Sequence, residues 1–246
     1  DPAVVKALAE KARKTEVAVP PGVVFVDCTS GDCPEKSKSN RLPAFFVDRT
    51  EVTVMAYAKC TEEGDCNRRR VQGPTVEEPT VPKSAKCNWF QTGREGYPMN
   101  CLSYAQAENY CRWVGGRLPT EAEWVRAARG AERTQFPWGD ELASCERTVM
   151  ADADGEGCGR GTSWRAGGTP EDLSPFGARD LGGNLREWVA DWYDPASVES
   201  TKRRRIVKGG SYIDRDAKAL AIHTRNALVP TDRSYLVGFR CIRAAE

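Results

Sequence analysis

Two carboxylates that could bind a hard cation lie on either side of a glycine turn in the second half of the chain. Asp180 precedes the turn and Glu187 follows it, while Gly182, Gly183 and Asn184 lie between them. Glycine and asparagine tolerate positive φ or close backbone approach, so a tight turn here would expose backbone carbonyl oxygens. Carboxylates together with carbonyl oxygens are the ligands that Ca²⁺ requires, although the spacing differs from that of an EF-hand loop. The alternative is a plain turn with a solvated Asp180 and a locally capping Glu187.

The cysteines are the second chemically informative set, because the chain has ten of them in 246 residues. Most lie in local pairs, namely Cys28/Cys33, Cys60/Cys66, Cys87/Cys101 and Cys145/Cys158, which leaves Cys111 and Cys241. There is no CxxC motif and only one histidine, so the spacing of a zinc site is missing. An even count in local pairs predicts disulfides and an oxidising compartment. The alternative is a set of buried thiols in a reducing compartment.

The single histidine, His223, restricts the chemistry that the chain can perform. Sites with several histidine ligands are impossible, and a Ser-His-Asp or Cys-His arrangement would have to use this residue. A core or surface position is the simpler interpretation of it. The sequence contains neither a Walker A motif nor a dinucleotide-binding glycine pattern.

The balance of charges excludes a generally basic or acidic protein. The chain has 36 basic and 35 acidic residues, with a formal net charge of +1. This balance offers no global attraction to nucleic acid or to an anionic membrane. The dense basic cluster at 202–205 is interpreted as a solvated loop before a strand. No apolar run approaches the roughly 18 residues of a membrane-spanning helix, so we expect no transmembrane segment.

Local signals predict two helices with defined ends. Ser103 and Gln106 form a capping box before a helix that stops at Gly115, and Thr120 and Glu123 form another before a helix that stops at Gly130. A third helix with a weak apolar face is predicted at 2–15. Strands are predicted at 22–27, 187–193, 205–208 and 236–242, with extended or mixed segments at 42–48 and 51–57, and irregular regions at 61–84 and 135–178.

Five segments, in this order, carry a resemblance to a known family. They are GGRLPTEAEWVRAARG (115–130), FPWGD (136–140), FGARDLGGNLREWVADWY (176–193), VKGGSY (207–212) and VGFRC (237–241). Together they closely resemble the formylglycine-generating-enzyme, or sulfatase-modifying-factor, family over roughly residues 20–245. The resemblance implies an α+β fold of the C-type-lectin-like kind with low regular secondary structure. We expect a linker or stalk helix at 1–19 and one domain of this family at 20–246.

The resemblance also implies one disulfide and a calcium site. The family joins the helix cysteine to the cysteine of the terminal strand, which here are Cys111 and Cys241. Its calcium site maps onto the following groups: the side chains of Asp180 and Glu187 and the carbonyls of Gly183 and Leu185. A structural Ca²⁺ is therefore expected at this turn. A second family calcium site aligns loosely with residues 148–154.

The oxidase activity of the family is not expected to carry over. Family enzymes oxidise a substrate cysteine to formylglycine with Cu(I), which is held by two cysteines just after the GGSY motif. Here no cysteine occurs between Cys158 and Cys241, so the pair is absent. Asp214 stands at or near the first position and Ala219 near the second, and carboxylates do not replace thiolates for Cu(I). No copper is expected, and Arg186 stands where the family commonly has Trp.

The first function that we consider is a non-catalytic, extracytoplasmic binding module, in the periplasm, at the cell surface or secreted. Such domains occur in bacterial lipoproteins and membrane-anchored kinases. The partner would be a protein, a peptide or a small anionic ligand, and not nucleic acid. The surface expected to bind it consists of Tyr212, Asp214, Arg215, Asp216, Lys218, His223, Arg225 and Arg186. The alternative is that these residues merely form a solvated loop with no binding role.

The second function is a divergent metal-dependent oxidase that acts on a thiol or peptide substrate. Asp214, His223 and a nearby carboxylate could provide the two carboxylates and one histidine of an Fe(II) site. Nothing in the spacing demands such a site.

Overall fold

The computed structural model describes residues 2–26, 39–67, 75, 86–193 and 203–245 of the chain. The helices are α1 (Pro2–Lys11), α2 (Val54–Glu63), α3 (Tyr104–Trp113), α4 (Glu121–Arg129) and α5 (Ala217–Leu220), with a 3₁₀ turn η2 (Asn88–Phe90). The strands are β1 (Glu16–Val19), β2 (Gly22–Phe25), β3 (Ser39–Leu42), β4 (Phe45–Asp48), β5 (Arg186–Trp192), β6 (Arg205–Lys208), β7 (Asn226–Leu228), β8 (Val237–Gly238) and β9 (Ile242–Ala244). Long loops make up most of the rest, as expected for low regular secondary structure.

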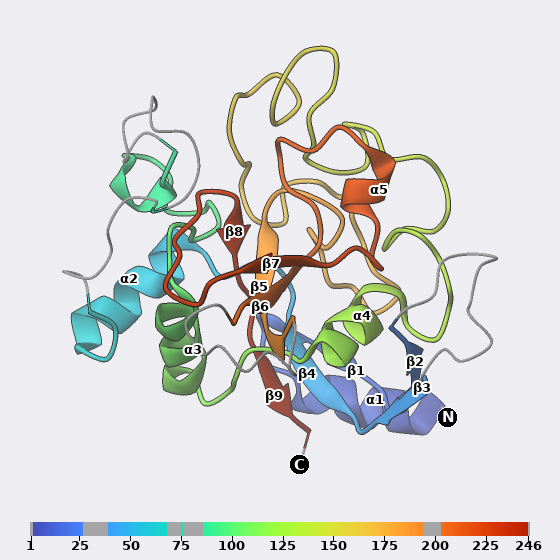
Figure 1. Ribbon diagram of the computed structural model, residues 1–246. Helices are drawn as coiled ribbons and strands as arrows, with labels where there is room; N and C mark the ends of the chain where they lie inside the picture. Colours follow the sequence, from blue (N-terminus) through green and yellow to red (C-terminus); the bar gives the residue numbers. More distant parts are fainter. Residues whose placement is uncertain (1, 27–38, 68–74, 76–85, 194–202, 246) are drawn as a thin grey trace.

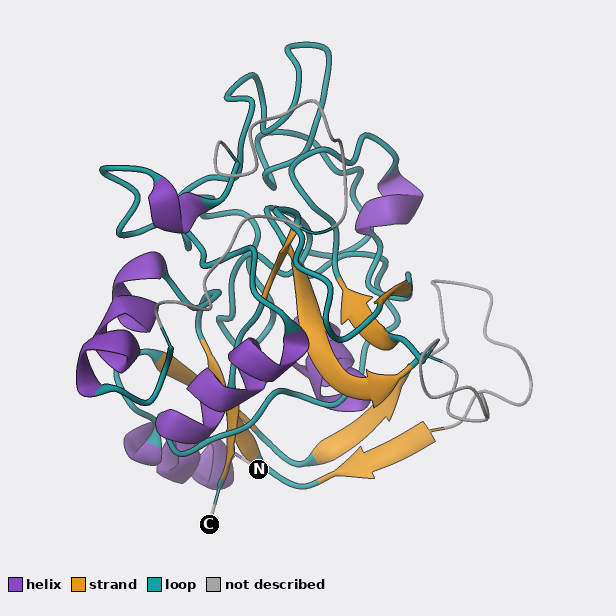
Figure 2. Cartoon of the chain, turned by 60° about the vertical axis from the view of Figure 1, so that its left-hand side comes forward, coloured by secondary structure: helices purple, strands orange, loops and turns teal. Residues whose placement is uncertain are grey.

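The strands form small sheets that bring distant parts of the chain together. One sheet has the order β1-β4-β9, a second is the ribbon β2-β3, and the third has the order β7-β6-β5-β8. All of these pairs are antiparallel except β5 with β8. The two termini therefore lie at one end of the molecule, and the long loops between α4 and β5 occupy the opposite end (Figure 1). Figure 2 shows helices packed beside the strands below these loops.

The N-terminal segment is tied to the sheet at residue 16. β1 pairs with β4 in the register Val17↔Val47, and Val17 and Val19 are buried. The boundary of the sheet therefore lies before the expected division at 19/20. A stalk role for α1 stays a prediction. Among the described residues, no helix is both long and apolar enough to cross a membrane.

The core lies on both faces of β5. Trp188 and Val189 are adjacent in this strand and both are fully buried, in different apolar clusters. Successive side chains of a strand point to opposite faces, so β5 is covered on both sides. Trp188 packs among residues of α2 and α3, and Val189 packs against α4 and the β1-β4-β9 sheet.

The capping signals located α3 and α4 correctly. Both capping boxes are formed, and Thr120 Oγ1 accepts a hydrogen bond from the backbone N–H of Glu123 at 3.2 Å. The prediction for 51–57 was wrong in its second half, because α2 begins at Val54. Thr53 caps this helix by accepting a hydrogen bond from the backbone N–H of Ala56 at 3.2 Å. The β-branched residues before the helix favour a strand, so the cap was not recognised from the sequence.

The strand predicted at 236–242 is divided into β8 and β9. Between them the Arg240 side chain turns into the interior, where it is fully buried. Its guanidinium donates to the backbone carbonyls of Asp48 at 3.0 Å and Arg179 at 2.7 Å. The backbone beside Arg240 still pairs with β4 and the segment after it, since the carbonyls of Phe239 and Cys241 accept from the N–H groups of Val52 and Asp48. α1 is also shorter than predicted, since it ends at Lys11.

Candidate functional site

Disulfides hold the loops around the candidate site. Among the described residues the bonds are Cys60–Cys66, Cys87–Cys101, Cys111–Cys241 and Cys145–Cys158, and no described cysteine is free. The three local pairs and the family pair are thus confirmed, while Cys28 and Cys33 lie outside the described residues. The Cys111–Cys241 bond closes a separation of 130 residues between α3 and the segment before β9. It fastens the C-terminal segment to the helical side of the core.

The glycine turn has the conformation that its residues predicted. Asp180 and Asn184 both have positive φ, at 59° and 66°. Gly182 and Gly183 instead permit close approach: an added Cβ would lie 2.5 Å from the Trp138 ring at the first, and 2.5 Å from backbone and side-chain oxygen atoms at the second. A side chain cannot be accommodated at either glycine without displacing its neighbours.

An ion pair lies at the centre of this turn. The Arg240 guanidinium donates to Glu187 through Nε at 2.8 Å to Oε2 and through Nη2 at 2.7 Å to Oε1. The indole Nε1 of Trp124 donates to Oε2 at 2.7 Å. Both charged side chains are almost completely buried. Several donors therefore satisfy the Glu187 carboxylate inside the protein, as a buried charge requires.

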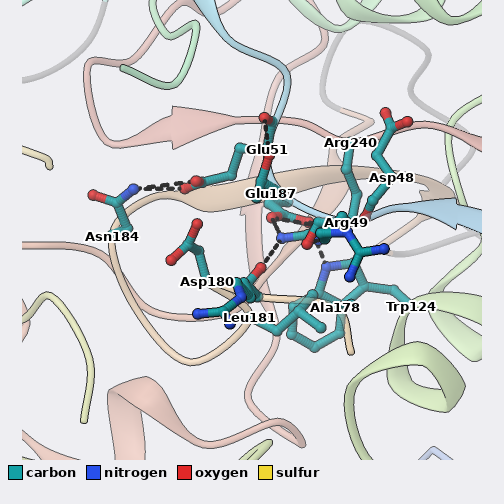
Figure 3. Close-up of polar contacts among 12 residues, drawn as sticks. Asp48, Arg49, Glu51, Trp124, Ala178, Asp180, Leu181, Asn184, Glu187 and Arg240 are labelled. Carbon is teal, nitrogen blue, oxygen red and sulfur yellow. Dashed lines mark hydrogen bonds and ion pairs between the residues drawn. The ribbon is translucent and has the colours of Figure 1, made fainter. Parts of the chain in front are cut away.

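Further carboxyl groups gather beside this pair (Figure 3). Asn184 Nδ2 donates to both carboxyl oxygens of Glu51, at 3.0 and 3.1 Å, and its Oδ1 accepts from the backbone N–H of Trp164 at 2.8 Å. Asp180 accepts a hydrogen bond from the backbone N–H of Gly167. The positive φ of Asn184 thus places one amide between the turn, the 164 loop and the segment after β4.

The Asp172 carboxylate connects the backbone of the glycine turn to a neighbouring loop. It accepts hydrogen bonds from the N–H groups of Gly182 at 3.1 Å and Gly183 at 3.3 Å, and from the Thr148 hydroxyl at 2.6 Å. The carboxylate therefore joins the glycine turn to the loop that follows α4.

The electrostatic consequence is a set of buried carboxyl groups that share one guanidinium. Burial, reinforced by Asp172, raises the pKa of Asp180 to about 7. Burial also raises the pKa of Asp172 to about 6 and that of Asp48 to about 7. The pKa of Glu51 is raised by burial and by the charges of Asp180 and Glu187. At these buried positions the carboxyl groups either stay protonated or require an additional positive charge nearby.

The two carboxylates of the predicted calcium site belong to one buried cluster, but they have different partners. Glu187 is engaged by Arg240, whereas Asp180 lies on the side of Glu51. The predicted set omitted Glu51 and Arg240. A signal for Arg240 was present, because it is the charged residue within the otherwise apolar VGFRC motif. Calcium binding stays a prediction.

The segment after GGSY places Asp214 in a second ion pair. Arg186 Nη2 contacts both oxygens of Asp214, at 2.6 and 2.7 Å. Ser211 donates to Asp214 Oδ2 through its backbone N–H at 2.7 Å and its hydroxyl at 2.8 Å. The two side chains of the ion pair are only 17% and 12% exposed. Asp214 thus closes the turn that follows the motif.

The other residues of the expected binding surface divide into buried and exposed groups. Tyr212 was expected at the surface, but it is 1% exposed and packs near Tyr235, with ring centroids 6.5 Å apart. Its backbone joins two loops, since its carbonyl accepts from Gly157 N–H and its N–H donates to the Asn184 carbonyl. The exposed members are Arg215, Asp216, Lys218 and Arg225.

His223 is half-buried in a cationic environment. Burial, followed by the charges of Lys208, Arg129 and Lys218, lowers its pKa. Its Nδ1 is shielded from solvent and has no hydrogen-bond partner among the described residues. Surrounding positive charge disfavours a metal cation at this imidazole.

The fold and site define a disulfide-stabilised α+β domain in which a buried carboxylate–arginine network organises long loops. The comparison with known families agrees: residues 2–245 match the model described as "Sulfatase-modifying factor enzyme 1-like domain". The chain belongs to this family, and the fold expected from the sequence motifs is confirmed.

Individual relatives include active and inactive members by name. The chain is 33% identical over 180 residues to the formylglycine-generating enzyme of Streptomyces coelicolor, covering 63% of this chain and 55% of that protein. It is 35% identical over 158 residues to mouse "Inactive C-alpha-formylglycine-generating enzyme 2", covering 60% and 49%. The chain thus spans about half the length of the curated relatives it matches. PvdO from Pseudomonas aeruginosa shares the fold, with a TM-score of 0.69, 23% identity and 94% coverage of both chains.

Proposed function

We propose that this domain is a non-catalytic, extracytoplasmic binding module, in which disulfides and a bound Ca²⁺ hold the loops that carry the binding surface. One observation carries the proposal. Asp214 stands at or near the first copper-ligand position of the family, and Arg186 stands where the family commonly has Trp. These two departures contact each other in an ion pair in which Arg186 Nη2 donates to both oxygens of Asp214. This ion pair supports a structural role for Asp214 in place of copper binding.

The family and the disulfides support the same proposal. The mouse and cattle relatives named as inactive are 35% and 34% identical to this chain. Relatives named simply as formylglycine-generating enzymes are 33% and 31% identical, so the family includes inactive members at a similar sequence distance. Four disulfides among the described residues fit an oxidising compartment outside the cytoplasm.

The buried carboxyl groups support a structural cation. Asp180 and Glu51 contribute negative charge beyond what Arg240 neutralises, and a hard cation with oxygen ligands suits that surplus. Asp180 and the carbonyls of Gly183 and Leu185 would hold the ion. Glu187 fits this role less well, because Arg240 and Trp124 engage its carboxylate.

Calcium binding is tested by elemental mass spectrometry and melting curves, with and without a chelator. We expect about one equivalent of calcium per chain and a fall in Tm on chelation. A ligand at a hundred times its Kd stabilises the folded state by about 2.7 kcal/mol. Asp180→Asn should weaken the response to calcium, whereas Asp65→Asn, at an exposed position, should leave it unchanged. A calcium-free protein with a Tm insensitive to added calcium would contradict this part of the proposal.

The exposed residues of the post-GGSY segment supply the proposed contacts. Arg215, Lys218 and Arg225 are cations at the surface, and Asp216 caps α5 by accepting a hydrogen bond from the backbone N–H of Lys218 at 2.9 Å. A protein, a peptide or a small anionic ligand suits this predominantly basic surface.

The absence of catalysis is tested by oxygen uptake with a cysteine-containing peptide. We expect none from the copper-treated protein. The double variant Asp214→Cys/Ala219→Cys restores thiols at the matching positions and is expected to bind Cu(I), which reports on the assignment of these positions. Turnover by the unmodified protein would instead favour the competing proposal of a divergent metal-dependent oxidase.

A further inference from the structure

The basic run that leads into β6 contacts aromatic rings. The guanidinium carbons of Arg203 and Arg205 lie 4.2 and 3.7 Å from the ring centroid of Trp192. That of Arg204 lies 5.1 Å from the ring centroid of Tyr193. These residues alternate in direction, as the side chains of an extended segment do. The expectation of a loop before a strand holds for residues 203 and 204, and the ring contacts give their side chains defined positions.

A further arginine joins the second ring from a distant segment. Arg225 lies 5.4 Å from the Tyr193 centroid, and its Nε pairs with Glu121 Oε1 at 3.0 Å. The same carboxylate oxygen also pairs with the buried Lys208, at 3.2 Å. The Glu121 carboxylate is therefore shared by Arg225 and Lys208.

Counting only the described residues, this surface carries exposed positive charge beyond what its acidic neighbours neutralise. Within the described part of the chain, Arg203 and Arg204 form no ion pair. Arg204 is exposed, Tyr193 is 37% exposed, and the Arg225 side chain is 39% exposed. The Nε atoms of Arg203 and Arg205 are shielded from solvent and have no hydrogen-bond partner among the described residues.

Stacking gives these guanidinium groups a defined orientation. A guanidinium lying on an aromatic ring keeps its N–H donors in its own plane, where they are available to an acceptor. Arg205 uses one donor on the Ala190 carbonyl. The ring contacts limit the rotamer freedom of the long side chains, which lowers the entropy that binding would otherwise cost.

We propose that Arg204 and Arg225, which both lie beside the Tyr193 ring, form a docking surface for an acidic protein segment. Charge complementarity carries the proposal, because planar guanidinium groups bind carboxylates through paired N–H donors. Arginine and tyrosine are also among the residues that dominate binding energy at protein interfaces. Only Arg225 is shared with the surface expected after GGSY, so this inference does not depend on a ligand for that segment.

The test uses a short fluorescein-labelled peptide in which Glu alternates with Thr, and a matched peptide in which Gln replaces Glu. Binding is measured by fluorescence anisotropy with the disulfide-bonded protein, at low and at physiological ionic strength. We expect the Glu peptide to bind and the Gln peptide to bind at least ~10-fold more weakly. Raising the ionic strength should weaken binding, since exposed charges are screened.

Charge-reversal variants locate the surface. Arg204→Glu/Arg225→Glu should weaken binding of the Glu peptide by at least ~30-fold, because attraction becomes repulsion at two positions. Lys14→Glu/Lys59→Glu has the same change in net charge at exposed positions elsewhere and should change the Kd by less than about 2-fold. Arg204→Lys keeps the charge but not the planar fork and should weaken binding by about 3-fold. Melting curves establish that each variant is folded.

Three results would overturn the proposal. The first is absence of Glu-peptide binding to the unmodified protein at low ionic strength. The second is equal weakening by the two double variants, which would mean attraction by net charge alone. The third is preferential binding of vesicles containing anionic phospholipid, which would assign the arginines to a membrane surface.

Discussion

Raising the pH in calcium-free buffer should destabilise the folded domain. Asp180 is buried beside Asp172, and this position raises its pKa from 3.8 to about 7. In the unfolded chain the same carboxyl is ionised above about pH 4. Between these two values the folded state holds a proton that the unfolded state has released. Stability therefore falls as the pH rises through this window, and the whole cost is present above about pH 7.

The size of the effect follows from the difference between the two pKa values. One pKa unit corresponds to about 1.4 kcal/mol, so Asp180 alone accounts for a loss on the order of 4 kcal/mol. The raised pKa values of Asp48 and Asp172 act in the same direction. A loss of this size is a large fraction of the stability of a typical domain.

The assay is urea unfolding followed by tryptophan fluorescence, at steps from about pH 5 to about pH 8 with chelator present. Asp180→Asn removes one titrating group and should flatten the pH dependence. Asp65→Asn, at an exposed site, should retain the full slope. A free energy of unfolding that is constant or rises across this range would refute the reasoning. Saturating calcium should restore stability at the upper pH if the ion occupies this network.

Three further changes probe the architecture. Arg240→Met should cost about 3–5 kcal/mol in urea unfolding, because it leaves the buried Glu187 carboxylate without its cation; little change would mean that the network is hydrated. Serine at both Cys111 and Cys241 should cost about 4–5 kcal/mol, since it frees a loop of 130 residues; an unchanged denaturation midpoint would exclude a stabilising disulfide. Gly183→Ala should cost about 1–3 kcal/mol through overpacking, measured as a lower Tm, and an unaltered Tm would show that the turn can relax.

Local interactions made much of the fold predictable. The helices α3 and α4 are delimited by capping boxes whose members are three residues apart, and the local disulfides join cysteines that are close in sequence. The left-handed residues Asp180 and Asn184 belong to types that tolerate positive φ. The start of α2 escaped prediction, because a β-branched segment precedes it.

The sequence drew attention to two segments of the buried network but did not predict the contacts between them. The glycine turn and the post-GGSY segment both belong to the network that the structure assembles. The sequence could not reveal that Tyr212 is buried or that Asp214 pairs with Arg186, because each outcome depends on how loops distant in sequence pack. Patterns of residue type predict local conformation, whereas burial depends on the whole fold.

The sequence by itself determined the family, the caps of α3 and α4, three local cysteine pairs and the absence of thiols after the GGSY motif, since each depends on residue type and short-range order. Only the tertiary structure decided which charges meet. Glu187 pairs with Arg240, which is 53 residues away in the sequence, and Asp214 pairs with Arg186, which is 28 residues away. Arg225, which follows α5 in the chain, contacts the Tyr193 ring that Arg204 also contacts. Electrostatic energy depends on distance and burial in space, and neither is encoded in the local pattern.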